Sequence, residues 1–395
     1  MNSLLSNLKV LDFTTLLPGP FATMKLADLG AEVLRIESPT RVDLIKVMPP
    51  LVDEDGTMSC YHTYLNRNKK SIALDLKKKE SLVIVEKLIE DYDIIVEQFR
   101  PGVMDRLGLS YEKLSAINSK LIFCSISGYG QTGPLKDRAG HDLNYLSLSG
   151  IMSYTGRKET GPMVLGIQLA DVGAGSYNAI LSILAAVIHR MTTGKGQYID
   201  ISMTDCLFPY HAIAAAGELS GAGAVGYETE MVNGGSLYGF YETSDCRFLS
   251  FGGLEPQFFN NFCEVIGLDE LKDGGVLQAG CLDESKKKVI DIIKSQPLDY
   301  WMDKFKEVDA CVEPVLTFNE AVTSDHAKER GLLVKVPGPD AKELTQLACP
   351  IKFSDFKPEY KRCGCKLGED TNDVLKSIGY SDGEIENIKS KGVFG

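Results

Sequence analysis

Residues 8–37 read LKVLDFTTLLPGPFATMKLADLGAEVLRIE, and this segment sets the fold class. The apolar run at 8–13 predicts a short strand, a Pro-Gly-Pro turn follows it, and residues 21–29 have helical spacing that ends at a glycine. Residues 31–37 then predict a second strand. Strand, turn, helix and strand in about thirty residues make a βαβ unit, which implies parallel strands joined by a right-handed crossover.

The same alternation continues along the first half of the chain. Strands are predicted at 71–76, 93–97 and 121–126, with a helix at 78–91 between the first two. An apolar helix at 172–191 precedes a further strand. We therefore predict a doubly wound, Rossmann-like α/β sheet. The glycines do not form the G-x-G-x-x-G pattern, so a dinucleotide cofactor is not indicated.

A change of composition divides the chain. Residues 214–226 are rich in Gly and Ala, which is typical of a linker, and a hairpin and three helices are predicted after it. We predict that residues 1–212 form the first part of a large α/β domain, which would hold the ligand, and that residues 213–317 form a linker with a smaller α+β domain. Residues 318–395 are predicted to form a C-terminal segment that returns to the large domain.

Composition excludes several classes of function. The 395 residues are 44% hydrophobic and carry a formal net charge of −12, which argues against a nucleic-acid-binding protein. Ten scattered cysteines lack the spacing of a zinc site and are interpreted as reduced thiols, so we expect no metal. The N-terminus lacks the features of a signal peptide, and no stretch of about 18 apolar residues is found. We expect a cytoplasmic protein that does not bind membranes.

Two short strings carry the chemistry. Residues 140–146 read GHDLNYL, and residues 168–173 read QLADVG. Histidine has an ordinary pKa near neutrality, and a sequestered aspartate can be tuned toward it. His141 and Asp171 can therefore remove a proton on one face of a carbon and return it on the other. Taken alone, the composition favours a turn histidine bonded to nearby backbone for His141, whereas Asp171 is equally the N-cap of the helix that follows it.

Several strings along the chain resemble the class III (CaiB/BaiF) CoA-transferase superfamily, and the resemblance spans nearly its full length. These strings are Val10-Leu11-Asp12-Phe13, Pro18-Gly19-Pro20, Ala27-Asp28-Leu29-Gly30-Ala31-Glu32-Val33, Asn66-Arg67-Asn68-Lys69-Lys70-Ser71, Phe99-Arg100-Pro101-Gly102-Val103, Ser127-Gly128-Tyr129-Gly130-Gln131-Thr132-Gly133-Pro134, Gly194-Lys195-Gly196-Gln197, Gly368-Glu369-Asp370-Thr371 and Leu375-Lys376-Ser377-Ile378-Gly379-Tyr380.

Three further strings resemble the α-methylacyl-CoA racemase branch: residues 140–145, the segment around Asp171, and residues 254–258. The resemblance implies that His141 and Asp171 are the two acid/base groups and that Glu255 pairs with His141. It also implies an intertwined homodimer with an active site between a large and a small domain. Transferases of the superfamily share the aspartate at position 171 as a nucleophile and are not expected to need the histidine.

The remaining expected site residues serve the enolate and the CoA moiety. We place one enolate-stabilising donor at the backbone N–H of Asp142, whose side chain is more often a cap or an ion-pair partner. On the superfamily resemblance, the CoA phosphates are expected to meet basic residues near the first strand ends. The candidates are Arg35, Lys69, Lys70 and Arg100, and Tyr145 is a candidate for packing on the thioester or pantetheine arm. A solvated surface charge for each lysine, and a core position for Tyr145, remain open alternatives.

Three hypotheses follow from the sequence. The first is epimerisation of 2-methylacyl-CoA thioesters through an enolate, with no cofactor beyond the CoA of the substrate. The second is CoA transfer between carboxylic acids through an acylated Asp171. The third is an acyl-CoA-binding subunit without turnover. The sequence does not distinguish a branched fatty acyl group from a sterol side chain or a short organic acid.

Overall fold

The chain folds into two compact units in a computed structural model that describes residues 3–395. Within the described residues, the large unit comprises 3–149, Leu165–Pro209 and His326–Gly395, and the small unit comprises Gly150–Val164 and Tyr210–Asp325. The predicted large domain had included 150–164. That segment groups with the small unit because the Tyr227 hydroxyl donates to the Met152 carbonyl (3.0 Å) and Arg157 pairs with Glu228 (3.1 Å).

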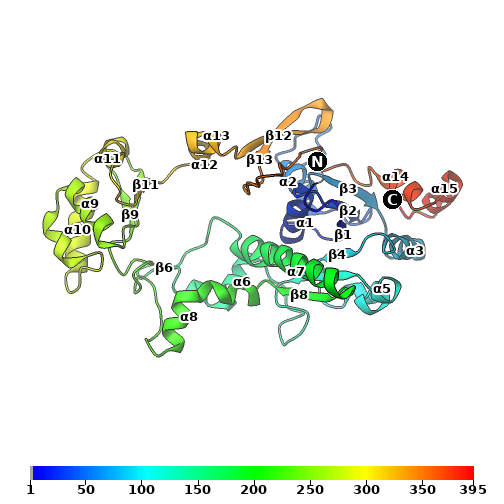
Figure 1. The fold of residues 1–395 in the computed structure, drawn as a ribbon, viewed down its shortest axis with the longest axis horizontal. Helices are drawn as coiled ribbons and strands as arrows, with labels where there is room; N and C mark the ends of the chain where they lie inside the picture. The colour runs from blue at the N-terminus through cyan, green and yellow to red at the C-terminus, as the bar shows by residue number, and fades with distance from the viewer. Residues whose placement is uncertain (1–2) are drawn as a thin grey trace. The chain divides into compact units, whose positions relative to one another are not determined.

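A six-stranded parallel sheet forms the large unit, and its strand order is β3-β2-β1-β4-β5-β8 (Figure 1). The strands are β1 (Lys9–Asp12), β2 (Glu32–Glu37), β3 (Lys69–Ala73), β4 (Ile94–Glu97), β5 (Ile122–Ser127) and β8 (Tyr198–Ser202). The predicted doubly wound parallel sheet is thus observed. Its strand order reverses between β1 and β4, and ligands of such sheets bind at this point, beyond the carboxyl ends of the strands.

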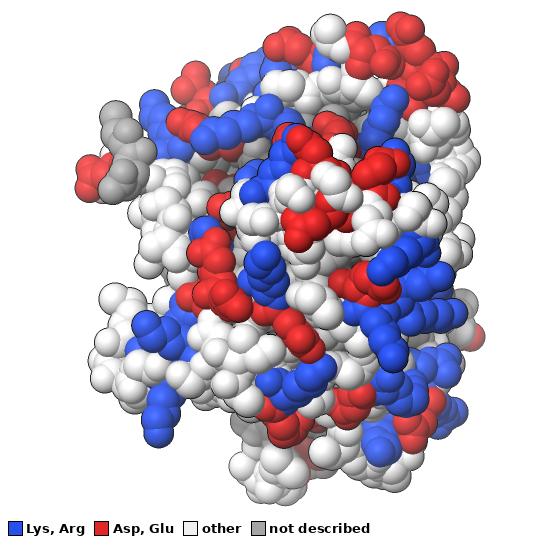
Figure 2. All heavy atoms as spheres, turned by 90° about the vertical axis from the view of Figure 1, so that its right-hand side faces the viewer, with Lys and Arg blue, Asp and Glu red and all other residues white. Residues whose placement is uncertain are grey.

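Helices cover both faces of this sheet. They are α1 (Pro18–Asp28), α2 (Cys60–Leu65), α3 (Lys79–Leu88), α4 (Val103–Arg106), α5 (Tyr111–Ile117), α6 (Asp142–Ser149), α7 (Tyr177–Thr193), α14 (Thr371–Ser377) and α15 (Asp382–Ser390). Helix α1 packs against β1, β2 and α7. Seen from the side on which α3 and α15 lie in Figure 1, the surface carries basic and acidic groups in small mixed clusters (Figure 2).

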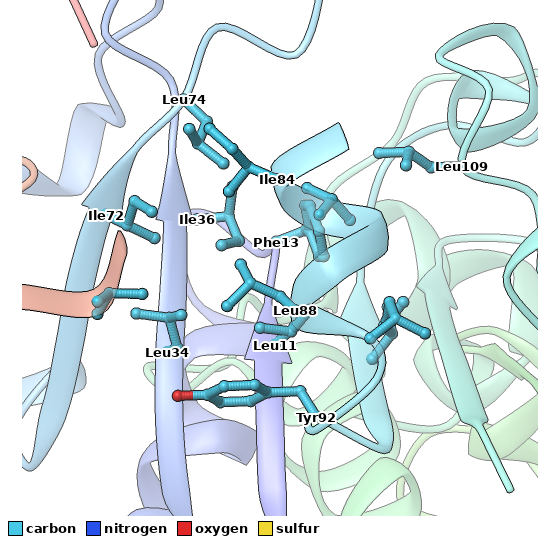
Figure 3. Close-up of a cluster of buried hydrophobic side chains, with 14 of the residues drawn as sticks. Leu11, Phe13, Leu34, Ile36, Ile72, Leu74, Ile84, Leu88, Tyr92 and Leu109 are labelled. Atoms are coloured by element: carbon cyan, nitrogen blue, oxygen red, sulfur yellow. The ribbon is translucent and has the colours of Figure 1, made fainter. Parts of the chain in front are cut away.

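The main core lies between the sheet and α3. Alternate strand residues such as Leu11, Leu34 and Ile72 point to this face and contact Ile84 and Leu88 of α3 (Figure 3). The C-terminal helices α14 and α15 complete the same cluster, so the two ends of the chain share one core. In the C-terminal segment, β12 (Leu333–Pro337) and β13 (Glu343–Leu347) form an antiparallel hairpin where the sequence predicted only extended stretches.

The small unit has a three-stranded antiparallel sheet of order β11-β10-β9. Its strands are β9 (Gly239–Glu242), β10 (Phe248–Phe251) and β11 (Val312–Pro314), and its helices include α8 (Ala212–Leu219), α9 (Pro256–Ile266), α10 (Leu282–Ile293) and α11 (Leu298–Phe305). The predicted hairpin and the three helices after it are found. Aromatic rings fill this core, with Phe251 stacked on Phe262 at 3.9 Å.

One helical run, Leu169–Thr193, is long and apolar enough to cross a membrane by length and composition alone. A single run of this kind is weak evidence, because core helices pass the same test. The sequence showed no such stretch because polar residues such as Asp171 and Asn178 interrupt it. In the structure, α7 packs against α1 and β5 within the large unit.

Candidate active site

A cavity of about 820 Å³ opens at the carboxyl ends of the central strands in the large unit. It is lined by the loop after β1 (13–16), the loop after β4 (98–101) and the segment after β5 that includes His141. Its position is the point where the strand order reverses, so the sheet topology alone accounts for a ligand site here.

His141 and Asp171 both line this cavity. His141 immediately precedes α6 and is exposed, and its backbone N–H donates to Oδ1 of Asn144 (3.0 Å). Asp171 is partly buried on a π-helical segment, Leu169–Ser176, that leads into α7. The structure therefore brings together the two groups that the sequence selected.

The environment of Asp171 favours its protonated form. Burial is the main cause and the negative charge of Asp142 the second, and together they raise the pKa of Asp171 to about 6, while the nearby His141 opposes the shift. A carboxyl group of this kind gains and loses a proton near neutral pH. It can serve as an acid in one step and as a base in another.

The carboxylate of Asp142 accepts hydrogen bonds from the backbone N–H groups at the start of this segment. Its Oδ1 accepts the N–H of Ala170 at 2.7 Å and the N–H of Asp171 at 3.0 Å. The N-cap position of the segment is Gln168, so Asp171 is not the cap that the alternative interpretation suggested. The capping role belongs to Asp142, and the proposed part of its own N–H in binding an enolate stays a prediction.

Tyr145 supports the turn that carries His141. Its hydroxyl donates to the Gly140 carbonyl at 2.5 Å, and its ring lies edge-on to Tyr129 with centroids 5.2 Å apart. A Cβ on Gly140 would lie 2.7 Å from the Tyr145 ring, and one on Gly128 would lie 2.4 Å from it. These two positions therefore require glycine. The ring is buried although it borders the cavity, which agrees with the core alternative.

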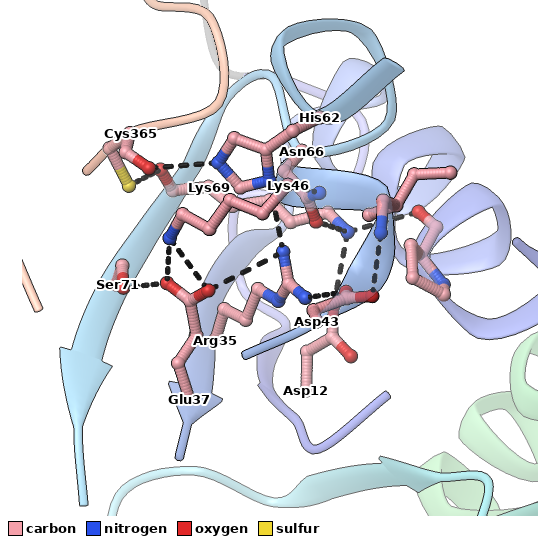
Figure 4. A network of polar contacts seen from close by, with 12 residues as sticks. Asp12, Arg35, Glu37, Asp43, Lys46, His62, Asn66, Lys69, Ser71 and Cys365 are labelled. Atoms are coloured by element: carbon pink, nitrogen blue, oxygen red, sulfur yellow. Dashed lines mark hydrogen bonds and ion pairs between the residues drawn. The ribbon is translucent and has the colours of Figure 1, made fainter. Parts of the chain in front are cut away.

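Lys69, one of the predicted CoA ligands, is buried in a network of charged and polar groups (Figure 4). Its ammonium donates to Asp12 (3.0 Å), Thr23 (2.7 Å), Asn66 (2.9 Å) and a backbone carbonyl, and it does not line the cavity. Burial lowers its pKa to about 8. Because its donors are already used inside the protein, Lys69 is not placed to bind a phosphate, which corrects the sequence prediction.

Arg35 belongs to the same network, and its expected role as a phosphate ligand stays a prediction. It borders the cavity but is only 2% exposed, and its guanidinium donates to the carboxylate of Asp43 and lies 3.7 Å from Glu37. Asp43 also accepts the backbone N–H of Leu16, which has a left-handed φ of 59°. Arg35 thus neutralises the carboxylate that holds the loop after β1.

Of the other two predicted cations, only Arg100 meets the cavity. Lys70 is exposed and pairs with Glu32 at 3.0 Å, away from the cavity lining. Arg100 is exposed and borders the cavity.

Five further exposed cations on the cavity rim were missed: Arg41, Lys77, Arg106, Lys136 and Arg138. Within residues 3–395, neither these five nor Arg100 forms an ion pair. They come from four separate connections of the chain, with Arg106 at the end of α4 and Lys136 and Arg138 in one loop, so no single local motif marks them. Their shared signal is that each follows the carboxyl end of a strand.

Glu255 lies in the small unit, in an exposed position at the N-cap of α9. Its predicted pairing with His141 stays a prediction. In the described part of the chain, no group of three His, Cys, Asp or Glu side chains is arranged to hold a metal ion.

A doubly wound sheet with a cation-rimmed cavity at its switch point and two acid/base side chains in that cavity is the arrangement of an enzyme for an anionic ligand. Residues 5–371 match the model of CoA-transferase family III. The chain therefore belongs to CoA-transferase family III, which confirms the resemblance found in the sequence.

Relatives of the chain include both racemases and transferases. It is 33% identical to the alpha-methylacyl-CoA racemase of Homo sapiens, over 98% of this chain and 96% of that protein. It is 32% identical to the succinyl-CoA:glutarate CoA-transferase of Homo sapiens, over 98% of this chain and 89% of that protein. A solved structure of a CAIB/BAIF family protein from Brucella suis matches with a TM-score of 0.84 at 28% identity, over 96% of this chain and 100% of that one.

Proposed function

We propose that this enzyme epimerises 2-methylacyl-CoA thioesters by 1,1-proton transfer through an enolate. The observation that carries the proposal is the pair of acid/base groups, His141 and Asp171, on one cavity at the switch point. The racemases among the relatives support the same activity.

Each of the two groups would work on one face of the α-carbon. One takes the α-proton as a base while the other, already protonated, delivers a proton to the opposite face. Each unit of pKa mismatch between donor and acceptor costs about 1.4 kcal/mol, so the raised pKa of Asp171 reduces the cost of removing a weakly acidic proton. The enolate oxygen needs a hydrogen-bond donor as well, and we assign this to the backbone N–H of Asp142. Glu255 would pair with His141 when the complete site is assembled.

The rim cations would hold the phosphates of CoA. Six unpaired basic side chains border the cavity in a protein whose net charge is −12, so they form a local attraction for a polyanionic ligand. We expect no cofactor beyond the CoA of the substrate and a cytoplasmic location.

We further propose a homodimer. Apolar side chains on α7 are left open to solvent in the single chain, with Leu181 67%, Ile188 66% and Met191 78% exposed. An apolar helix face of this kind is typical of a surface that binds another subunit. Light scattering of the purified protein would test this, and a monomer at micromolar concentration would contradict it.

The decisive test is incubation of one epimer of a 2-methylacyl-CoA in D₂O, without free acid, with the α-hydrogen followed by NMR and the stereochemistry by chiral chromatography. We expect deuterium incorporation together with racemisation. His141→Ala and Asp171→Ala should each suppress both while circular dichroism shows an intact fold. Wild-type racemisation by either variant would refute the two-base scheme.

The second candidate is CoA transfer between carboxylic acids, because transferases are almost as similar to this chain as racemases are. Asp171 would attack the thioester to give a mixed anhydride, which the released CoA thiolate would convert to an aspartyl-CoA thioester. His141 would then be dispensable. Trapping of acylated Asp171 with hydroxylamine or borohydride during turnover would support this candidate, and failure to trap any adduct would count against it. If the protein bound acyl-CoA but catalysed neither α-proton exchange nor CoA transfer, the hypothesis of a non-catalytic acyl-CoA-binding subunit would remain.

A further inference from the structure

Asp142 connects the two chain segments that carry the proposed bases. It follows His141 directly in the sequence and begins α6. Its Oδ1 accepts the N–H of Asp171, which lies 29 residues further along the chain, and the N–H of Ala170. One peptide link and one hydrogen bond thus span the path from His141 to Asp171.

Among the described residues, no basic side chain competes with these two N–H groups for the Asp142 carboxylate. The side chain of Asp142 is partly buried and forms no ion pair with a Lys, Arg or His of residues 3–395. Its charge is offset by the two amide N–H groups at the start of the segment.

The packing of the segment leaves its amides dependent on Asp142. Helices α1, α6 and α7 all contact Leu169–Ser176. Among residues 3–395, only α6 supplies a side-chain acceptor for the N–H groups of Ala170 and Asp171. Removal of that acceptor would leave two partly buried donors without a partner and would free the segment to shift.

We propose that the side chain of Asp142 is the positioning residue that fixes the backbone of Asp171 relative to His141. This inference rests on the proposed function, because the separation of two bases matters only if both act on one carbon. The predicted use of the Asp142 N–H toward the enolate is a different role, which a side-chain substitution does not remove.

The contact also has an electrostatic consequence. The titratable groups facing Asp171 are Asp142, His141 and Tyr145, all from the segment 141–145. No charged side chain of α1 or α7 shifts the pKa of Asp171. The negative charge of Asp142 raises the pKa of Asp171, so removal of that charge should lower it.

Two substitutions separate the acceptor from the charge. Asp142→Asn keeps an oxygen that can accept the two N–H groups and removes the charge, whereas Asp142→Ala removes both. Asp137→Asn is the matched control, since Asp137 is an exposed acid four residues before His141 and does not border the cavity.

The experiment measures deuterium exchange of a 2-methylacyl-CoA and binding of CoA by the full-length variants. We expect Asp142→Ala to lose about 100-fold in kcat with unchanged CoA affinity, because a misplacement near 1 Å costs about that much. Asp142→Asn should lose much less of kcat than Asp142→Ala, because it keeps the acceptor and only makes Asp171 a weaker base. The acid limb of its pH profile should move to lower pH, and Asp137→Asn should match the wild type. Wild-type kcat in Asp142→Ala would overturn the proposal. Equal losses in the alanine and asparagine variants would do so as well, because the acceptor would then not be the cause.

A second readout does not depend on turnover. The side-chain carboxyl of Asp171 can be titrated by ¹³C NMR in the wild type and in Asp142→Asn. We expect a lower midpoint in the variant, and an unchanged midpoint would show that the Asp142 carboxylate does not contact this segment in solution. If the wild type exchanged no α-proton yet the midpoint fell, the proposed function would fail while the contact stood.

Discussion

Protonation of Asp171 should set the acid limb of α-proton exchange. The pKa of this carboxyl group is raised to about 6, and a raised pKa favours the protonated form. As the pH falls through 6, the Asp171 carboxylate becomes protonated and can no longer act as a base. With that pKa, about ten in eleven molecules carry ionised Asp171 at pH 7 and about one in eleven at pH 5, so kcat/KM should fall about tenfold.

An aspartate with an ordinary pKa would give a different pH profile. A carboxyl group of pKa about 3.9 would remain more than about nine-tenths ionised at pH 5, and the rate would hardly change. The assay is the initial rate of deuterium incorporation at low substrate concentration between pH 5 and pH 8, with circular dichroism at each pH as the control for folding. A flat profile between pH 5 and pH 7 in a folded enzyme would refute the assignment of Asp171 as a base held in a buried, negatively charged setting.

Three further substitutions test other parts of the site. Lys69→Met should cost about 3–5 kcal/mol of unfolding free energy in urea, because it strands a buried carboxylate, yet leave CoA affinity intact. A weaker affinity at unchanged stability would instead make Lys69 a ligand. Gly140→Ala should lower the free energy of unfolding by about 1–3 kcal/mol and reduce kcat, because its Cβ would lie 2.7 Å from the Tyr145 ring. An unchanged melting temperature and unchanged turnover would contradict this packing. Arg138→Ala should weaken CoA binding about fivefold at low salt and less at high salt. Lys70→Ala is the control and should leave CoA binding unchanged. Equal losses of affinity in both variants would show that cations on the cavity rim do not differ from other surface cations.

Local patterns in the sequence were enough to predict the sheet. The period of apolar residues is a property of neighbouring residues, so it could be recognised without a structure. The predicted Pro-Gly-Pro turn is instead the first turn of α1, because proline is well tolerated at the start of a helix. The reversal of strand order then places any ligand at the carboxyl ends of the strands. His141 and Asp171 could be selected because each stands in a distinctive string.

The partners of charged residues could not be predicted in the same way. Lys69 stands in a basic run and resembles a surface residue, but its carboxylate partner, Asp12, lies 57 residues away in the sequence. The acceptor for the amides before Asp171 likewise comes from Asp142, in a different helix. Such pairings depend on which strands and helices become neighbours, and a local pattern contains no information about that.

Contacts between residues 62–71 and residues 347–370 limit how early the large unit can complete its folding during synthesis. The buried guanidinium of Arg67 donates to the carbonyl of Leu347 at 2.6 Å, the ring of His62 bonds to the carbonyl of Cys365 at 2.8 Å, and the N–H of Ser71 donates to Asp370 at 2.8 Å. A growing chain lacks these three partners until residues 347–370 have been synthesised. The edge of the sheet at β3 is therefore completed only after residue 370 has been synthesised, and a chain truncated before residue 347 should expose this edge to chaperones and proteases.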